Sequence, residues 1–434
     1  MKIGIVGLGF VGLSLAAVLG SKGFSVIGSD IDKSKILKIR SGKTPFYEPN
    51  LEKTIKNALK QDFKLTSELS PIVNQCKLVF ITVGTPQGKN GAINLTMVEK
   101  IMQKIGMLLK NSKNDPSIIL KSTVIPGTTK KMLSILERKS GKICGEDFGL
   151  IVNPEFLRES QAIKDTIDPH VVVLGGINDK FLNRLKKFYK KLYLGKPLIQ
   201  TNHETAEMIK YANNSFLATK ISFINLIATI CESIPGTNID KIAQSIGFDP
   251  RIGNLFLNAG PGYGGSCLPK DIKAIINFST KLGIKPSLFQ AVESINKNQI
   301  EKIFKILKNS VGKLEGKTIA ILGLAFKSNT DDVRDSVSIK LIHKLLEKGA
   351  IVKAHDPRAI ENAKSIFGMK IKYSKSIRNT LSDSDCAIIV TPWNEYSKIG
   401  KNDIKMMKKR VIIDTRRILI NKNLDLKYFG FGLG

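Results

Sequence analysis

The sequence has few cysteines and histidines, which limits the chemistry that it can support. Its five cysteines are scattered over 434 residues without CxxC spacing, and their number is odd. A disulfide framework or a zinc site is therefore not expected, and free thiols favour a reducing, cytoplasmic compartment. None of the four histidines has a partner at metal-ligand spacing, so we expect no metal. The cysteines are Cys76, Cys144, Cys231, Cys267 and Cys386.

Long apolar runs are also missing. No run free of charge is long enough to span a bilayer, and we therefore expect no membrane partner. The chain begins with MKIGIVGLGF, which is typical of a buried strand and its turn. It lacks the apolar core and small-residue cleavage site of a signal peptide, so none is expected.

Acidic residues are scarce, with 37 Asp and Glu against 68 Lys and Arg, and the net charge is +31. Such a charge favours either a polyanionic partner or a lysine-rich surface that serves solubility and small phosphorylated ligands. The lysines are spread along the chain in short clusters such as KKFYKK and KMMKKR, and no RNA-binding signature with interleaved aromatics accompanies them. We therefore expect no nucleic-acid partner.

The opening MKIGIVGLGFVG predicts a dinucleotide-binding turn. An apolar strand over residues 2–6 leads into Gly7, Gly9 and Gly12, and a helix and a second strand that ends at Asp30 follow. The glycines permit a tight turn, close approach of a pyrophosphate and close packing of the helix on the strand. A carboxylate at Asp30 accepts hydrogen bonds from a ribose and repels a 2′-phosphate, which predicts NAD rather than NADP.

Further parallel strands are predicted by KLVFITVGTP, SIILKSTV and GLIVNPEF, three apolar runs that stop at polar residues, Gly or Pro. In a doubly wound sheet, the carboxyl ends of the strands form the ligand crevice. Thr85, Pro86, Thr123 and Glu155 are therefore expected near the cofactor or the substrate.

Residues 204–232 have apolar residues at intervals of three and four, which predicts a long amphipathic helix. Lys210 and Asn214 lie one turn apart on it. Taken alone, Lys210 would be interpreted as a surface lysine. Beside a nucleophile, Lys210 and Asn214 together would stabilise an oxyanion. The long apolar helix suggests a dimer built around residues 204–300, although the same stripe could pack on flanking domains.

The stretch GPGYGGSCLPKD contains the candidate nucleophile. Pro269 fits the first turn of a helix, which places Cys267 just ahead of a helix N-terminus. The helix dipole and Lys270 would favour a thiolate, and Asp271 could orient a proton or a water. The other four cysteines are interpreted as small buried hydrophobes.

After residue 313, GKTIAILGLAFKSNTDD repeats the pattern of strand, glycine turn, helix and strand. The third glycine of the turn is missing, and Phe326 and Lys327 occupy the tight part of the loop. This absence argues against a second dinucleotide site. The predicted fold is α/β, with two Rossmann-like doubly wound parallel-sheet domains joined by a central long-helix domain. The expected boundaries are 1–200, 201–305 and 306–434.

Several motifs together resemble the UDP-glucose/GDP-mannose dehydrogenase family over nearly the whole chain. They occur in that family's order: VGLGFVGL, GTP, STVIPGTT, NPEFLRES, KYANNSFLA, DPRIG, GPGYGGSCLPKD and GLAFKSNTDDVRDS. The resemblance implies oxidation of the C6 alcohol of a nucleotide sugar to a carboxylate with two NAD in succession. The thiolate of Cys267 would trap the aldehyde as a thiohemiacetal, and the resulting thioester would be hydrolysed.

The resemblance also implies residue roles. Lys210 and Asn214 would stabilise the oxyanion, Asp271 would orient a proton or water, and Thr123 and Glu155 would handle water in hydrolysis. Arg251 resembles an arginine lent across a homodimer interface to the partner's substrate, with a surface salt bridge as its alternative. Arg334 and the aspartates around it could equally form a structural ion network. The candidate cofactor-binding set is Gly7, Gly9, Phe10, Val11, Gly12, Asp30, Lys35, Thr85, Pro86, Thr123, Lys270 and Arg334. The candidate substrate-binding set is Glu155, Phe156, Leu157, Arg158, Lys210, Asn214, Arg251, Phe256, Tyr263, Gly264, Lys327 and Arg416.

The choice of sugar rests on the same resemblance. Ser266 stands where members that act on N-acetylmannosamine nucleotides typically carry histidine. UDP-glucose is the expected substrate, GDP-mannose is the alternative, and a UDP-N-acetyl-hexosamine ranks third. Two other classes stay open: a degenerate dehydrogenase that binds nucleic acid, and an alcohol dehydrogenase that stops at the aldehyde.

Overall fold

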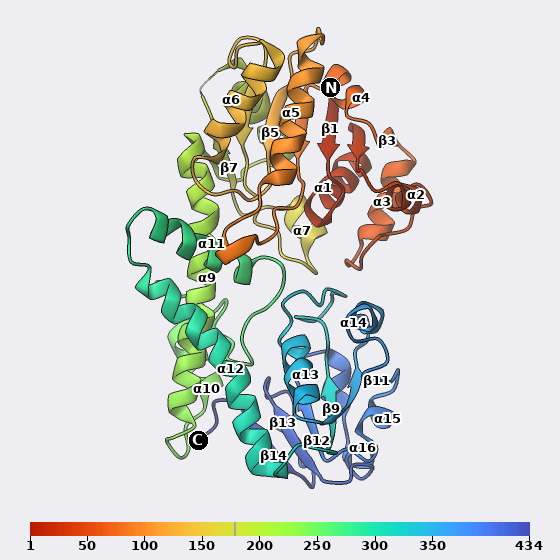
Figure 1. Cartoon of the computed structure of the whole chain (residues 1–434), viewed down its shortest axis with the longest axis vertical. Coiled ribbons are helices and arrows are strands. Elements are labelled where there is room, and N and C mark those ends of the chain that lie inside the picture. Colours follow the sequence, from red (N-terminus) through yellow and green to blue (C-terminus); the bar gives the residue numbers. More distant parts are fainter. Residues whose placement is uncertain (178) are drawn as a thin grey trace. The chain divides into compact units, whose positions relative to one another are not determined.

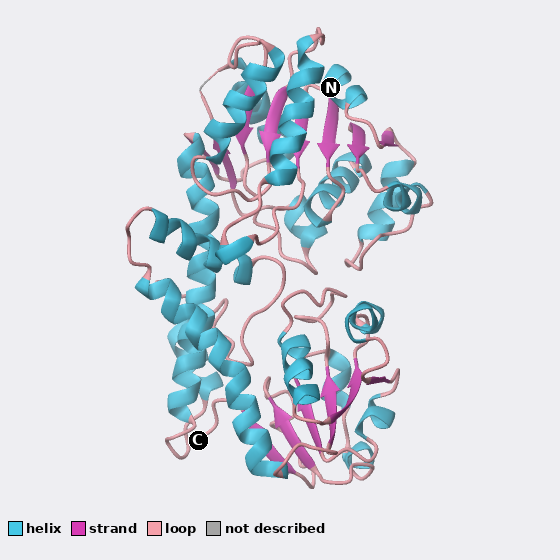
Figure 2. Cartoon of the chain, in the orientation of Figure 1, coloured by secondary structure: helices cyan, strands magenta, loops and turns pink. Residues whose placement is uncertain are grey.

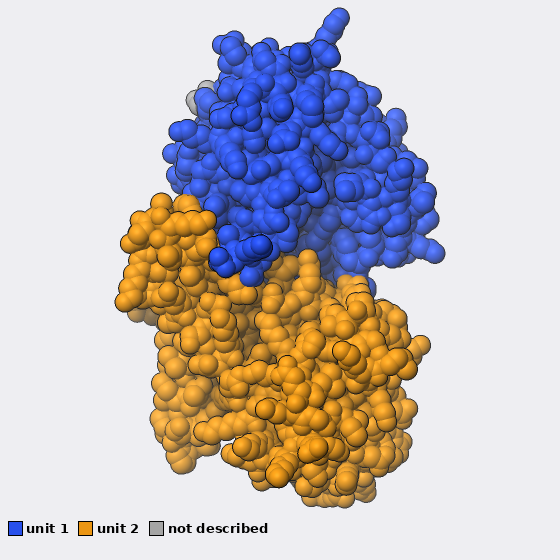
Figure 3. Space-filling view, viewed as in Figure 1, with its two compact units in different colours: residues 1–213 blue, residues 214–434 orange. Residues whose placement is uncertain are grey.

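The computed structural model describes residues 1–177 and 179–434. The chain divides into two compact units, residues 1–213 and residues 214–434 (Figure 3). Each unit contains its own sheet with helices packed on it (Figure 2). The α/β fold class with two Rossmann-like sheets and a helical region between them in sequence is confirmed, whereas the predicted three domain boundaries stay a prediction.

The first unit is built on a sheet of eight strands in the order β3-β2-β1-β4-β5-β6-β7-β8 (Figure 1). The first six strands in sequence run parallel, and β7 pairs with β6 antiparallel. The sheet therefore departs from a fully parallel one at a single junction. The strands are β1 Lys2–Val6, β2 Ser25–Ser29, β3 Phe63–Thr66, β4 Leu78–Ile81, β5 Ser117–Leu120, β6 Gly149–Val152, β7 Val172–Gly175 and β8 Leu198–Thr201.

Helices cover both faces of this sheet, and the core forms two clusters. One cluster joins the sheet to α1, α2, α3, α7 and α8, and the other joins it to α4, α5 and α6. Strands such as β4 and β5 are buried on both faces because every residue in them is apolar or small, as expected of parallel strands. The helices are α1 Phe10–Ser21, α2 Lys33–Arg40, α3 Leu51–Leu59, α4 Ser70–Gln75, α5 Thr96–Lys110, α6 Thr128–Ser140, α7 Ala162–Ile167 and α8 Lys180–Leu192, with a short 3₁₀ turn at Lys89–Gly91.

The second unit combines long helices with a six-stranded sheet in the order β11-β10-β9-β12-β13-β14, in which all pairs are parallel. The long helices are α9 His203–Cys231, which begins in the first unit, α10 Ile239–Gly247, α11 Leu268–Lys281 and α12 Ser287–Val311. The strands are β9 Thr318–Leu322, β10 Ile351–His355, β11 Lys372–Tyr373, β12 Cys386–Ile389, β13 Val411–Asp414 and β14 Lys427–Gly430. The remaining helices are α13 Val337–Glu347, α14 Ile360–Phe367, α15 Ile377–Leu381 and α16 Lys401–Ile404, with a 3₁₀ turn at Asn394–Lys398.

The predicted long helix over residues 204–232 is confirmed as α9. By length and composition alone, α9 is apolar enough to cross a bilayer. It nevertheless carries buried polar groups that bind within the first unit: Glu207 accepts hydrogen bonds from the backbone N–H groups of Gly127 and Thr129, at 2.7 and 2.8 Å. Glu207 thereby satisfies the N-terminus of α6, which is the behaviour of a helix inside a protein core.

Candidate active site

The turn after β1 has the geometry that a pyrophosphate requires. Gly7 has φ +94°, and a Cβ at Gly12 would lie 1.9 Å from the carbonyl oxygen of Gly7, so neither position accepts another residue without movement. Gly9 differs, because a Cβ there would meet no protein atom within 4 Å. The open space in front of Gly9, at the N-terminus of α1, fits an anionic ligand that must approach the backbone.

Asp30 lies directly after β2 and is nearly buried. Its Oδ2 accepts hydrogen bonds from the backbone N–H of Leu8 at 2.8 Å and from Lys35 Nζ at 2.7 Å. The carboxylate thus joins the glycine turn to the second strand. Thr85 and Thr123 follow the neighbouring strands β4 and β5, and Thr85 Oγ1 donates to the backbone carbonyl of Thr123 at 2.8 Å. These residues fit the NAD site predicted from the sequence.

Glu155 and Lys210 form a buried ion pair in the first unit. Glu155 Oε1 lies 2.9 Å from Lys210 Nζ, and the two side chains are only 8% and 5% exposed. Glu155 Oε2 also accepts the backbone N–H of Leu157 at 2.6 Å. Burial opposes the charge on Glu155, but Lys210 and this N–H keep its pKa below the usual value. The Lys210 ammonium lies 5.5 Å from the ring centre of Phe156. The alternative interpretation of Lys210 as a surface lysine therefore does not apply, because the side chain is buried and paired with Glu155.

Three neighbouring groups were missed by sequence reasoning. Lys121 and Asn153 stand immediately after the adjacent parallel strands β5 and β6. Lys121 Nζ donates to Asn153 Oδ1 at 2.9 Å, and the buried Tyr189 hydroxyl donates to the same oxygen at 2.6 Å. Burial, opposed by Glu155 and reinforced by Lys210, lowers the pKa of Lys121 to about 8. The available signal was the position of Lys121 at a strand's carboxyl end, next to the predicted Thr123.

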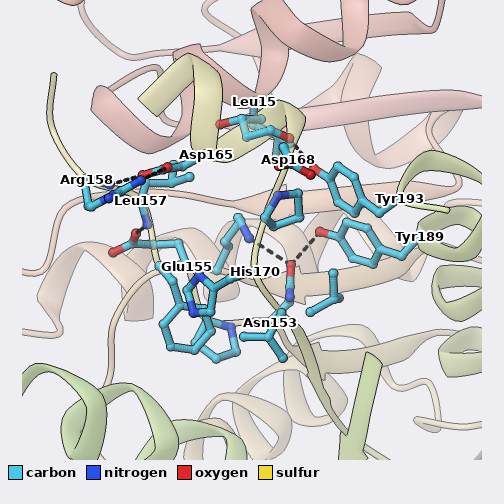
Figure 4. A pocket seen from close by; sticks show the side chains of 17 residues that line it. Leu15, Asn153, Glu155, Leu157, Arg158, Asp165, Asp168, His170, Tyr189 and Tyr193 are labelled. Carbon is cyan, nitrogen blue, oxygen red and sulfur yellow. Dashed lines mark hydrogen bonds and ion pairs between the residues drawn. The ribbon is translucent and has the colours of Figure 1, made fainter. Parts of the chain in front are cut away.

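A cavity of about 110 Å³ adjoins these groups in the first unit (Figure 4). Glu155, Asn153 and Tyr189 lie on its wall, and the exposed Asp168 and His170 stand where it reaches the surface. Arg158, another predicted substrate residue, lines the cavity too, where it is held by Asp165 with its Nη2 at 2.6 Å from Oδ1. The complete lining comprises Leu15, Lys121, Asn153, Pro154, Glu155, Phe156, Leu157, Arg158, Asp165, Thr166, Asp168, Pro169, His170, Val171, Val172, Tyr189 and Tyr193.

In the second unit, Cys267 is the N-cap residue of α11, and Pro269 lies in the first turn, as predicted. The Cys267 side chain is partly exposed, and Ser266 Oγ lies 3.6 Å from its sulfur. Burial raises the pKa of Cys76 to about 12 and that of Cys144 to about 11, and raises the pKa of Cys386 as well. Cys76, Cys231 and Cys386 are buried as predicted, whereas Cys144 is partly exposed, so the prediction that it is a buried hydrophobe is wrong. Cys267 therefore combines access to solvent with a helix N-terminus, the setting of a reactive thiol.

Asp271 is buried one turn into α11 and has two side-chain partners. Asn214 Nδ2 donates to its Oδ2 at 2.6 Å, and Lys270 Nζ donates to its Oδ1 at 2.5 Å. Asn214 and Asp271, two of the predicted catalytic residues, are thus in direct contact. Lys270 was predicted to support the thiolate and the cofactor, and in the structure its charge is directed at Asp271, because the two residues are adjacent on the first turn.

The glycines before Cys267 pack closely against other parts of the second unit. A Cβ at Gly264 would lie 2.4 Å from the backbone oxygen of Asp335. A Cβ at Gly265 would lie 2.6 Å from the ring of Phe326. The loop is therefore glycine-rich because it packs tightly against residues of the same unit.

The other predicted substrate residues are distributed over the second unit. Arg251 is exposed and pairs with Asp249 at 2.6 Å, and Lys327 Nζ lies 5.5 Å from the ring centre of Phe326. Arg416 Nε donates to the backbone carbonyl of Val390 at 3.2 Å. Two further residues belong to loops: Phe256 has φ +66°, and Tyr263 is buried with its N–H bound to Asn296 at 2.8 Å.

Arg334, predicted in the cofactor set, forms an ion pair with Asp332 in which Nη2 lies 2.5 Å from Oδ2. Asp335 pairs with Lys340 at 2.9 Å. Two separate ion pairs therefore lie around Arg334, and its place in the cofactor set stays a prediction. Within residues 1–177 and 179–434, no group of three or more His, Cys, Asp or Glu side chains could hold a metal ion.

Comparison with known proteins identifies all three parts of the chain. Residues 1–193 match the NAD binding domain of the UDP-glucose/GDP-mannose dehydrogenase family, residues 204–298 its central domain and residues 320–421 its UDP binding domain. The chain is 40% identical to the UDP-glucose 6-dehydrogenase TuaD of Bacillus subtilis over 420 residues, which cover 96% of this chain and 89% of that protein.

Two further similarities extend over the full length. The UDP-glucose 6-dehydrogenase of Rickettsia typhi is 40% identical over 443 residues, which cover 100% of this chain and 99% of that protein. The structure of a UDP-glucose dehydrogenase from Pyrobaculum islandicum superimposes with a TM-score of 0.94 at 32% identity and covers 100% of this chain and 98% of that one. The chain therefore belongs to the UDP-glucose/GDP-mannose dehydrogenase family, with an NAD-binding first unit.

Proposed function

We propose that the protein oxidises UDP-glucose to UDP-glucuronate in two NAD-dependent steps through a covalent bond to Cys267. The names of the most similar relatives support UDP-glucose as the substrate. One observation carries the thiol route: Cys267 is partly exposed at the N-terminus of α11, one turn from the buried Asp271 that binds Asn214. We also propose a reducing cytoplasm as the compartment, because none of the five cysteines, all within the described residues, forms a disulfide.

Different residues of the chain act in the two oxidations and in the hydrolysis. NAD, when bound, accepts a hydride in each oxidation. The Cys267 thiolate adds to the C6 aldehyde and forms a thiohemiacetal, whose oxyanion Lys210 and Asn214 stabilise. Buried carboxylates, Glu155 for Lys210 and Asp271 for Asn214, hold these two side chains in position.

The thioester formed by the second oxidation must then be hydrolysed. Glu155 is the candidate general base that takes a proton from the attacking water. Its carboxylate lines the cavity of the first unit and is kept ionised by Lys210. Thr123 lies beyond the neighbouring strand β5 and is the second candidate. The geometry within each unit supports this division of roles.

We further propose a homodimer in which Arg251 reaches the partner's substrate. The support is an exposed apolar face on α9 that carries Phe216, Phe223, Leu226 and Ile230 at helical spacing, with Phe216 65% exposed. Large apolar faces of this kind are typical of protein–protein interfaces. Arg251 is also available for such a role, because its side chain is 87% exposed.

Replacement of the thiol tests the proposal directly. Cys267→Ser should reduce formation of the carboxylate by on the order of a thousandfold or more, because the nucleophile is lost. Cys144→Ser is the matched control, since Cys144 is also partly exposed but has no helix N-terminus, and it should keep the wild-type rate. Full four-electron turnover by Cys267→Ser would overturn the covalent route.

The substrate is tested by counting NADH. UDP-glucose, GDP-mannose and a UDP-N-acetyl-hexosamine are supplied separately, and NADH formed per sugar is measured. We expect two NADH per UDP-glucose and a kcat/KM for it that exceeds those of the other two sugars. A larger kcat/KM for GDP-mannose would assign the chain to the other branch of its family.

A further inference from the structure

We propose that Lys121 is a positioning and proton-accepting residue for thioester hydrolysis, and that the cavity beside Glu155 supplies the water. The inference rests on the proposed function, because it concerns the thioester on Cys267. Lys121, Asn153 and the cavity beside Glu155 all belong to the first unit.

Lys121 is fixed by contacts from two neighbouring elements. Its ammonium donates to Asn153 Oδ1 at 2.9 Å, and Asn153 is itself held because its Nδ2 donates to the backbone carbonyl of Val173 at 2.8 Å. The Tyr189 hydroxyl donates to the same Oδ1 at 2.6 Å. Asn153 therefore orients Lys121, and as a neutral amide it does not itself take up a proton.

The charged groups around Lys121 make a proton transfer reasonable. Glu155 and Lys210 are the charges that act on it most strongly, and they already neutralise one another through their 2.9 Å ion pair. The protonated Lys121, which is partly buried, is therefore a cation in excess of this neutral pair. Burial lowers the pKa of Lys121 to about 8, so a fraction of the side chain is neutral near physiological pH. The other titratable side chains on the cavity wall are Arg158, Asp165, Asp168, His170, Tyr189 and Tyr193.

The cavity connects these groups to solvent. Its volume of about 110 Å³ is enough for several water molecules, and polar atoms line it. Of the residues that line it, Glu155 is buried and Lys121 is partly buried, whereas Asp168 and His170 are exposed. Glu155, Asp168 and His170 are labelled in Figure 4. Water can therefore reach Glu155 from outside the first unit, and a proton can leave by the same path.

The hydrolytic step balances with these two groups. Water attacks the acyl carbon, a C–O bond forms, and Glu155 takes the proton that the water loses. The C–S bond then breaks, and its electron pair returns to the sulfur of Cys267 as a thiolate. The product acid gives a second proton to the cavity water, which carries it to solvent. Neutral Lys121 accepts the first proton from Glu155, so that Glu155 is again ionised. Lys121 then releases this proton to the same water and is neutral again for the next turnover.

Pre-steady-state kinetics of Lys121→Met tests the inference. Both oxidations precede hydrolysis, so the variant should release a burst of two NADH per Cys267 and then turn over on the order of tenfold or more slowly. Acid quench and mass spectrometry should find the acylated Cys267 accumulating. Lys113→Met, which removes an exposed loop lysine, is the control and should show wild-type kinetics. Loss of the burst together with turnover would overturn the inference, because Lys121 would then act before hydrolysis.

Lys121→Arg separates proton transfer from charge. Arginine keeps a cation and does not release its proton near neutral pH. We therefore expect Lys121→Arg to hydrolyse the thioester as slowly as Lys121→Met. Recovery of the wild-type rate in Lys121→Arg would show that only the positive charge matters and would overturn the proton-accepting role.

The wild-type protein alone supplies a second test that does not depend on folding of a variant. Decay of the acyl-enzyme should rise with pH and level off above about 8, as Lys121 loses its proton. A decay rate that does not change from pH 7 to 9, or that rises with hydroxide without a plateau, would overturn the inference. Absence of any acyl-enzyme would instead reject the proposed function, so the two failures are distinguishable.

Discussion

The two Rossmann-like sheets of this chain have the same arrangement of strand, glycine turn and aspartate. They differ in the space beside the turn that a ligand could occupy. In the first unit, β1 leads through Gly7 to α1, and Asp30 follows β2. In the second unit, β9 leads through Gly323, and Asp356 follows β10. Both aspartates accept the N–H of the residue after the turn glycine, Leu8 at 2.8 Å and Leu324 at 2.7 Å. The local architecture is therefore the same.

The surroundings of the two aspartates differ. Besides Leu8, Asp30 binds the backbone N–H of Asp32 and the side chain of Lys35. Asp356 accepts five hydrogen bonds within its own unit, from Trp393 Nε1 and from the backbone N–H groups of Leu324, Ala325, Arg358 and Ala359. The second aspartate is saturated by the protein, so it is a structural group, whereas Asp30 at the NAD-binding turn keeps the position of a ribose acceptor.

The turns differ in the same sense. The space in front of Gly9 is open, whereas its counterpart Ala325 is fully buried. The helix of the first unit begins at Phe10, directly after the turn, whereas α13 begins only at Val337. The second turn therefore has no helix N-terminus immediately behind it. The first unit binds NAD, whereas in the second unit Ala325 is buried and Asp356 is occupied by donors of the protein, so the fold alone does not decide the ligand.

The largest effect is expected from Gly12→Val. A Cβ at Gly12 would lie 1.9 Å from the carbonyl oxygen of Gly7 and 2.4 Å from Thr82 Oγ1, so α1 must move away from β1. Overpacking against backbone should cost about 3 kcal/mol or more and abolish NAD binding. Calorimetric titration with NAD and urea unfolding measure both effects.

The counterpart in the second unit, Ser328→Ala, removes one hydrogen bond to Pro392 and should cost only about 1 kcal/mol. Tight NAD binding by Gly12→Val would break the comparison.

Asp356→Ala should be the next most disruptive change. Five donors lose their acceptor, and several of them are buried, so the free energy of unfolding should fall by about 3 kcal/mol. NAD affinity should stay at the wild-type value, because Asp356 acts in the other unit. Urea denaturation and NAD titration on the same sample check the two statements. A large loss of NAD affinity with unchanged stability would show that the second aspartate has a role in cofactor binding.

Asp30→Ala should act mainly on cofactor choice. Loss of a charged hydrogen-bond acceptor for the ribose should lower kcat/KM for NAD by about tenfold to a hundredfold. Lys35, which now binds Asp30 at 2.7 Å, would become available to a 2′-phosphate, so kcat/KM for NADP should rise. Steady-state kinetics with both cofactors measures the switch. Lys35→Met in the same background removes the new cation and should cancel the gain for NADP, and a gain that survives this change would contradict the argument.

Local patterns predicted much of this comparison. The strands at residues 2–6 and before Asp30, the long helix α9 and the position of Cys267 before α11 follow from runs of a few residues. The missing third glycine also indicated that the second turn is different. These features depend on neighbours in sequence, which is why composition and periodicity reveal them.

Contacts between distant segments could not be predicted in the same way. Lys121 meets Asn153 because β5 and β6 are neighbours in register, and Asp356 meets Trp393 across 37 residues of sequence. The tight packing of Gly264 against Asp335 also depends on a contact far along the chain. The residue type at a position does not predict a partner that is distant in sequence. The contacts of Lys121 and Asp356 therefore became known only from the structure.

The smallest effect is expected from Ala325→Gly, and it decides whether the second turn is closed by one methyl group or by its whole environment. Gly in place of a buried Ala should cost about 1 kcal/mol through chain entropy. No second NAD should bind, because Asp356 stays saturated and α13 still begins far from the turn. Calorimetric titration should therefore give one NAD per chain, as in the wild type. Two NAD per chain would mean that the methyl group alone closes the site, and the difference between the units would then reduce to a single residue.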